Sequence, residues 1–153
     1  MGDYFVMSTR FNKSNASDFG FISKSENLAI NPKDNSTWIK VVLYDFGWGK
    51  ENGFYKFPLP NFDVLFELVL YSENRDDKYG AAAIILEKFP EELLYQCERL
   101  AKDPYRKKEF KELVELFKLN ISTNRCSVAQ KTNEQIQNDY MRWKRISEIA
   151  KKT

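Results

Sequence analysis

Three carboxylates fall close together in the middle of the chain: Glu73, Asp76 and Asp77. Paired carboxylates can serve as acid and base, and a larger set of oxygen ligands can hold a divalent cation. Either chemistry needs further groups at a defined distance, which spacing along the chain does not establish. Acidic residues are also common in the first turn of a helix, where they meet the positive end of its dipole. We therefore favour helix capping for this cluster, and an acidic recognition patch is the alternative.

A glycine-bearing loop, Gly47-Trp48-Gly49-Lys50-Glu51-Asn52-Gly53, lies between two predicted strands. Its glycines lack the spacing of loops that bind phosphates or dinucleotides. The favoured interpretation is a hairpin turn, in which glycine accepts positive φ angles. The alternative is that Trp48 anchors a partner, because aromatic residues dominate interface energetics. With the acidic cluster, this hypothesis names six candidate partner-binding residues: Trp48, Lys50, Tyr55, Glu73, Asp76 and Asp77.

The chain contains no histidine and has two cysteines, Cys97 and Cys126. Without imidazole it lacks Ser-His and Cys-His nucleophile activation, histidine metal ligation and the usual proton shuttle near neutral pH. Two widely spaced thiols cannot complete a zinc site by themselves. We expect no catalytic residue, no metal site and no cofactor, and therefore a protein that is not an enzyme. An enzyme that uses carboxylates or tyrosine as acid and base is the remaining alternative.

The composition is that of a folded protein: 153 residues, 42% apolar and 15% aromatic, with a net charge of +2. This length predicts a single domain over 1–153. No apolar run approaches the ~20 residues that a membrane-spanning helix needs. The first residues do not follow the pattern of a signal peptide, which has a basic segment before an apolar one. We therefore expect a cytoplasmic protein with no membrane partner.

Residues 1–60 are predicted to be β-rich. The predicted strands are 4–11, 19–23, 27–30, 37–46 and 53–57. The strand over 37–46 has the strongest signal, and its apolar residues on both faces are typical of a central or doubly covered strand. Pro58 ends the last strand, because proline has no N–H to donate to a neighbouring strand.

Residues 61–153 are predicted to be helical. Helices are expected over 62–71 and 75–88, from Pro90, after Asp103-Pro104, and after Thr132. Asn61 is a favourable N-cap, Pro90 suits a first helical position, and Thr132 with Gln135 forms a capping box. Short turns make neighbouring helices antiparallel. The predicted fold class is α+β, an N-terminal antiparallel β-sheet followed by an antiparallel helical bundle of about five helices.

Charge is unevenly distributed along the chain. Residues 61–100 carry a net of −5, whereas residues 101–153 carry 13 basic and 7 acidic groups. Near the end, basic and aromatic residues are interleaved as on nucleic-acid-binding surfaces: Tyr140, Arg142, Trp143, Lys144 and Arg145. On a helix, Tyr140 and Trp143 share the buried stripe, so the simpler interpretation of the basic residues is a solvated face. A nucleic-acid-binding regulator that uses the basic C-terminal helix is therefore the alternative function, and a protein partner is favoured.

The stretch Asp76-Asp77-Lys78-Tyr79-Gly80-Ala81-Ala82-Ala83-Ile84-Ile85-Leu86 resembles helical hairpins of the HEAT type, over about 62–119. In size, α+β architecture and this stretch, the chain resembles bacterial toxin-immunity proteins. The resemblance implies a small cytoplasmic inhibitor that neutralises a partner toxin by direct binding. Many inhibitors of nucleases are strongly acidic, and this chain departs from that pattern. The contact would then come from the acidic middle of the chain or from the Trp48 loop.

Overall fold

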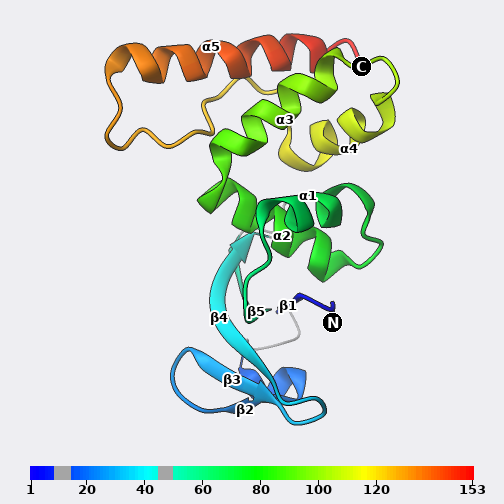
Figure 1. The fold of residues 1–153 in the computed structure, drawn as a ribbon, viewed down its shortest axis with the longest axis vertical. Coiled ribbons are helices and arrows are strands. Elements are labelled where there is room, and N and C mark those ends of the chain that lie inside the picture. The colour runs from blue at the N-terminus through cyan, green and yellow to red at the C-terminus, as the bar shows by residue number, and fades with distance from the viewer. Residues whose placement is uncertain (9–14, 45–49) are drawn as a thin grey trace. The chain divides into compact units, whose positions relative to one another are not determined.

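The computed structural model describes residues 1–8, 15–44 and 50–153, without the side chains of Tyr44, Lys50 and Glu51. The chain divides into two compact units, residues 1–84 and residues 85–153. Strands belong to the first unit, and helices follow them to the end of the second (Figure 1). The predicted α+β class is confirmed. The prediction of a single domain stays a prediction.

The first unit is built around an antiparallel sheet, which has five strands among the described residues. In chain order they are β1 (Phe5–Met7), β2 (Ile22–Ser23), β3 (Leu28–Asn31), β4 (Ser36–Tyr44) and β5 (Lys50–Lys56). The spatial order is β1-β5-β4-β3-β2, so the predicted central position of β4 is confirmed. Of the strand predicted over 4–11, β1 covers three residues, and 9–14 lie outside the described residues.

A short 3₁₀ helix, η1 (Ala16–Phe19), precedes β2. The strand predicted over 19–23 is therefore wrong at its beginning, since pairing starts only at Ile22. The cause is local: the Asp18 carboxylate accepts the N–H of Asn15 at 3.0 Å, and Gly20 ends the turn with a φ of 78°. Short polar side chains that bond nearby backbone in this way compete with strand pairing.

One face of the sheet packs against η1 and the residues around it. The buried cluster there comprises Val6, Ala16, Phe21, Ala29, Trp38 and Phe54. The Phe21 ring stacks on Trp38 with centroids 4.9 Å apart and meets Phe54 edge-on at 5.7 Å, both favourable aromatic geometries. This aromatic core fixes which side chains of each strand lie on this face.

Two helices complete the first unit. α1 (Phe62–Tyr71) begins at Asn61 as predicted, because the Asn61 Oδ1 accepts the N–H of Val64 at 3.1 Å. α2 (Arg75–Lys88) follows after a short turn and continues past the boundary of the unit. Its residues 80–85 are all buried.

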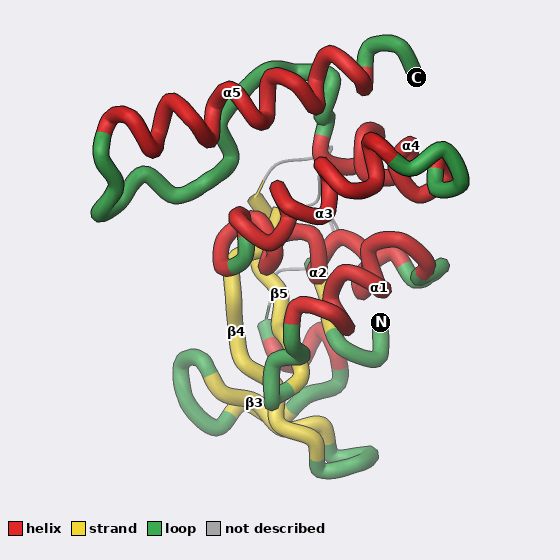
Figure 2. The backbone as a smooth tube through the Cα atoms, turned by 45° about the horizontal axis from the view of Figure 1, so that its top comes forward, coloured by secondary structure: helices red, strands yellow, loops and turns green. Residues whose placement is uncertain are grey.

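The second unit contains three further helices, α3 (Pro90–Lys102), α4 (Lys107–Phe117) and α5 (Asn133–Ala150) (Figure 2). α3 packs against both α4 and α5. The predicted starts at Pro90 and Thr132 are confirmed: the Thr132 hydroxyl accepts the N–H of Gln135 at 3.1 Å, and the Gln135 side chain accepts that of Thr132 at 2.9 Å. Within the described residues, no helix combines the length and apolar character needed to cross a bilayer.

Candidate functional site

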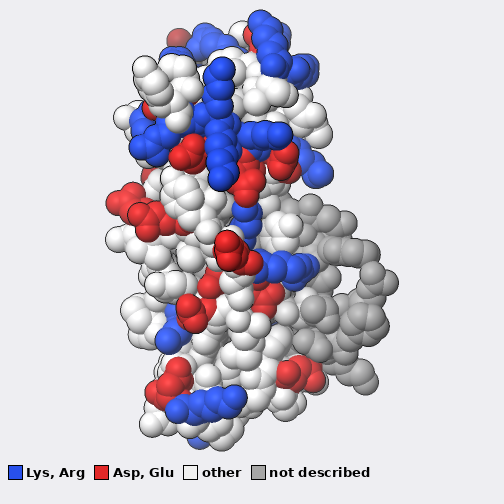
Figure 3. All heavy atoms as spheres, turned by 90° about the vertical axis from the view of Figure 1, so that its right-hand side faces the viewer, with Lys and Arg blue, Asp and Glu red and all other residues white. Residues whose placement is uncertain are grey.

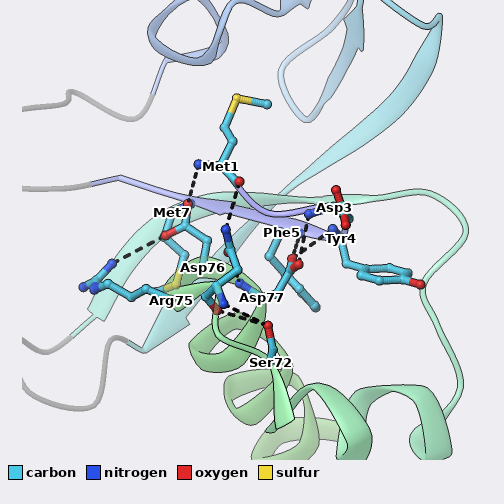
Figure 4. Close-up of polar contacts among 10 residues, drawn as sticks. Met1, Asp3, Tyr4, Phe5, Met7, Ser72, Arg75, Asp76 and Asp77 are labelled. Atoms are coloured by element: carbon cyan, nitrogen blue, oxygen red, sulfur yellow. Dashed lines mark hydrogen bonds and ion pairs between the residues drawn. The ribbon is translucent and has the colours of Figure 1, made fainter.

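The acidic cluster lies at the turn between α1 and α2, but its most buried member does not cap the helix. Asn74 does so, because its Oδ1 accepts the N–H of Asp77 at 3.0 Å. The Asp77 carboxylate reaches instead to the N-terminal segment (Figure 4). Its Oδ1 accepts the N–H groups of Tyr4 and Phe5, each at 2.9 Å, and its Oδ2 accepts that of Asp3 at 3.0 Å. Asp76 and Asp77 lie in the first turn of α2 as predicted, and the Asp77 carboxylate in addition holds two remote segments together.

The two other carboxylates of the cluster differ in exposure. The Asp76 side chain is 15% exposed, accepts the N–H of Met7 at 3.3 Å and lies 3.5 Å from the Arg75 guanidinium. Glu73 is exposed. Asp77 itself is 4% exposed, so a partner cannot reach its carboxylate without breaking the bonds above. Of the three predicted contact residues, Glu73 alone offers its carboxylate fully to solvent.

Two glycines permit this junction. A Cβ on Gly2 would lie 2.1 Å from Asp77 Oδ1, and a Cβ on Gly80 would lie 2.4 Å from Phe5 Cγ. Real Cβ atoms do not approach other atoms so closely, and thus both positions need glycine for contact rather than for backbone conformation. The junction of the N-terminal segment with α2 is therefore closely fitted on both sides of Phe5.

A second candidate surface is the sheet face opposite η1. Strand register places two neighbouring rows of side chains on it: Tyr55–Ile39–Leu28, and Phe57–Thr37–Ile30–Ile22. Beyond Tyr55 the first row leads to Phe5 of β1, which is buried against Gly80 of α2 and is not counted in the open part of this face. Phe57 directly follows β5, and its N–H donates to the Thr37 carbonyl at 2.8 Å. Partners across strands and alternate residues along a strand share one face. We call these seven residues the apolar sheet face.

The apolar sheet face is open to solvent at both ends of its longer row. Phe57 is 59% exposed and Ile22 is 51% exposed, while the five residues between and beside them are half-buried. Exposed apolar residues are ordinary when scattered, whereas a contiguous apolar patch is typical of an interaction surface, so this face is a candidate contact surface. Tyr55, a partner-binding residue predicted from the sequence, belongs to this face.

Two of the predicted contact residues cannot be placed. Trp48 lies outside the described residues, and so does the side chain of Lys50. Sequence reasoning missed Ile22 and Phe57. The alternation of Leu28 with Ile30 is a signal for a two-faced strand, but only the register shows that Ile22 and Phe57 extend the same row.

A cavity of about 430 Å³ lies on the η1 side of the sheet. Its polar lining includes Ser17, Ser23, Ser25, Glu26 and Lys40. The Ser23 hydroxyl donates to the backbone carbonyl of Ser25 at 3.1 Å, which is a turn contact and not nucleophile activation. No group of three or more His, Cys, Asp and Glu side chains suited to a metal ion occurs in the part of the chain that the structure describes.

In the second unit, two ion-pair groups join α3 to α5 or to the segment before it. Arg142 forms a two-pronged pair with Glu98, with Nε to Oε2 at 3.0 Å. Hydrogen bonding to the Arg142 guanidinium lowers the pKa of Glu98. Lys131 Nζ lies 2.6 Å from Asp139 and 2.8 Å from Glu91, and these hydrogen bonds raise the pKa of Lys131. Partly buried pairs of this kind fix the register of the packed elements.

These pairs change the view of the basic C-terminal helix. Of the five residues that suggested nucleic acid, Arg142 is engaged by Glu98 and Trp143 is 0% exposed. The Arg125 guanidinium lies 5.0 Å from the Trp143 ring centroid and donates to the carbonyls of Lys118 at 2.9 Å and Ile121 at 3.1 Å. Trp143 is thus a core residue, and Lys144 and Arg145 are left exposed.

Both cysteines of the second unit are buried free thiols. Cys97 lies on α3 as predicted, and burial raises its pKa strongly. Cys126 lies in the connector before α5, and burial raises its pKa also. Protonated, enclosed thiols behave as small apolar groups.

The chain matches no protein-family model, no curated protein and no solved structure.

Proposed function

We propose that this chain is a non-enzymatic protein-binding module and that the apolar sheet face is its contact surface. The observation that supports this most is the longer row of that face, with Phe57 and Ile22 each more than half exposed at its ends. Covering such a row removes apolar surface from water, at roughly 25 cal/mol for each Å². Aromatic side chains are enriched among the few residues that contribute most of the binding energy of an interface. Phe57 has that role here.

Charge around the first unit would guide the partner. The exposed Glu73 lies on the same unit as the apolar sheet face, and residues 61–84 of that unit carry five acidic and two basic groups, a net of −3. Charged groups outside an apolar contact mainly raise the association rate. A partner with an apolar patch and a basic rim fits this combination.

Within this proposal, the particular role is that of a bacterial immunity protein, which neutralises a partner toxin by direct binding. Its support is the resemblance in size and architecture, together with a chain that has no imidazole. The test is to co-purify the chain with the product of the neighbouring gene and to ask whether its expression protects cells from that product. If neither a complex nor protection is found, the immunity role is wrong.

The contact surface has its own test, with a matched control. Phe57→Ser and Ile22→Ser each remove an exposed apolar side chain from the apolar sheet face. Val42→Ser removes one that is 52% exposed on β4, at a position that faces the opposite side of the sheet. We expect the first two to weaken binding by at least about tenfold and the third to leave it unchanged. Equal effects of all three would place the contact elsewhere.

A nucleic-acid-binding regulator that uses the last helix is the alternative. Lys144 and Arg145 carry that hypothesis, since Arg142 and Trp143 have internal partners. Measuring the affinity of the chain for DNA or RNA at several salt concentrations tests this alternative. If it is right, the affinity falls steeply as salt rises and is lost when Lys144 and Arg145 are replaced.

A further inference from the structure

The second unit contains a cavity of about 360 Å³ at one end of its helices. It is lined by the last turn of α3, the turn into α4, the first turn of α4, the end of α5 and the residues after α5. Leu100 and Phe110 form an apolar floor, being 2% and 3% exposed. A volume of this size, with an apolar floor and a few polar groups, is typical of a small-ligand site.

Three lysines line this cavity: Lys102, Lys107 and Lys152. All three are exposed, and among the described residues none of their ammonium groups forms an ion pair. The one acidic lining residue, Asp103, uses Oδ1 to accept the N–H of Tyr105 at 2.9 Å. Figure 3 shows Lys and Arg side chains (blue) gathered on one face of the second unit, with Asp and Glu side chains (red) among them. The cavity is therefore positively charged at its rim.

An exposed aromatic residue directly follows a lining residue in the chain. Tyr105 is 92% exposed and lies in the turn between Pro104, which lines the cavity, and Arg106. A tyrosine held in a turn with almost no burial gains nothing from the core, and such a ring is the usual platform on which an unpaired base stacks. An apolar floor, a cationic rim and an exposed ring occur together.

We propose that this cavity binds a nucleotide, with the phosphate on Lys102, Lys107 and Lys152 and the base against Tyr105. The nucleotide can be free or a unit of a single-stranded nucleic acid, because the recognised chemistry is the same. The site is distinct from the last-helix surface predicted from the sequence, and it lies on a different unit from the apolar sheet face. Its failure would therefore leave the proposed protein-binding function standing.

The test uses two probes, a labelled single-stranded RNA of about ten nucleotides and adenosine monophosphate. Fluorescence anisotropy measures the first, and competition or calorimetry measures the second. For a single strand, the slope of log affinity against log salt should be about −0.7 if the three lysines hold one phosphate, and about −2 if each contacts a different phosphate. Binding of the RNA alone identifies a strand as the ligand, and binding of both identifies the free nucleotide as sufficient. Binding of neither at low salt overturns the proposal.

Matched variants locate the site. Replacing Lys102, Lys107 and Lys152 with alanine removes three charges from the cavity, and replacing Lys111, Lys144 and Arg145 removes three exposed charges elsewhere on the same unit. We expect the first variant to lose at least tenfold in affinity and nearly all salt dependence, and the second to keep most of both. The reverse result would place the anion outside the cavity, at Lys111 on α4 or at Lys144 and Arg145 on α5, and would overturn the assignment.

The stacking role has a separate control. Tyr105→Ala should weaken binding of the RNA by about fivefold or more, whereas Tyr105→Phe should bind like the original chain. Tyr95→Ala removes another exposed tyrosine, 60% exposed on α3, and should have no effect. Because all replaced side chains are exposed, the thermal midpoint should be unchanged in each variant. A Tyr105→Ala variant that binds normally would show that the base lies elsewhere.

Discussion

The carboxylate of Asp77 lies directly against the backbone of Gly2, where a Cβ would be only 2.1 Å from Asp77 Oδ1. The same carboxylate accepts three successive backbone N–H groups, those of Asp3, Tyr4 and Phe5. Successive N–H groups that converge in this way form a nest for an anion. The anion here is a side chain from a helix more than 70 residues away along the chain, so this contact helps close the first unit.

Removing the Asp77 carboxylate should destabilise the first unit. In Asp77→Ala, the backbone N–H groups of Asp3, Tyr4 and Phe5 lose the acceptor that this 4% exposed side chain supplies, which should cost about 2–4 kcal/mol of unfolding free energy. Asp77→Asn keeps one acceptor oxygen and should cost less. Urea unfolding measures the difference, and Glu73→Ala, at an exposed position, is the control expected within about 0.5 kcal/mol of the original chain. A harmless Asp77→Ala would contradict the structural role.

Because Gly80 contacts Phe5, replacing Gly80 with alanine should lower the stability of the fold, although helix propensity alone predicts that it would raise it. Alanine normally stabilises a helix by about 1 kcal/mol over glycine. At position 80, however, the new Cβ would meet the Phe5 ring at 2.4 Å, so Gly80→Ala should destabilise by roughly 1–3 kcal/mol. Combining Gly80→Ala with Phe5→Leu makes room for the methyl group. The double variant should be more stable than the sum of the two single effects predicts.

Local chemistry made much of the fold predictable. The helices at Asn61, Pro90 and Thr132 begin where expected, because an N-cap, a first-turn proline and a capping box act within a few residues. The long strand β4 was predictable for the same reason, since its apolar residues are contiguous.

The candidate surfaces were less predictable, because they depend on contacts between distant residues. Asp77 has the sequence context of a first-turn capping residue, and nothing local indicates that its acceptors face residues 3–5. The apolar sheet face depends on register, which a shift of one residue would turn to the other side. The burial of Trp143 was predictable from the apolar stripe of the last helix, whereas the pairing of Arg142 with Glu98 was not, because the two residues lie 44 positions apart.

The Arg142–Glu98 pair should make stability depend on acid. The pKa of Glu98 is lowered by its hydrogen bonds from Arg142, relative to an ordinary value of 4.5. The pair is therefore fully stabilising above about pH 4.5, and its contribution is lost as pH falls through the lowered pKa. Because both side chains are partly exposed, the contribution should be about 1 kcal/mol.

Glu98→Gln should remove that contribution and flatten the fall in stability below pH 4.5. Chemical unfolding at a series of pH values measures the slope. Glu92→Gln, at an exposed position on the same helix, is the matched control and should leave it unchanged. If the two variants show the same acid profile as the original chain, the pair does not contribute.

The reaction rates of the two buried thiols measure unfolding of the second unit. Burial raises the pKa of both Cys97 and Cys126, and the thiolate is the form that reacts with disulfide reagents. At neutral pH the folded chain should therefore react slowly at both positions, and the rate should rise with urea along the unfolding curve.

The single variants Cys97→Ala and Cys126→Ala separate the reaction of one thiol from that of the other. Cys126, 7% exposed and in a connector, should become reactive at lower urea than Cys97, which is 0% exposed and lies on α3. Rapid labelling of Cys97 in the absence of urea would contradict the packing of α3 described above.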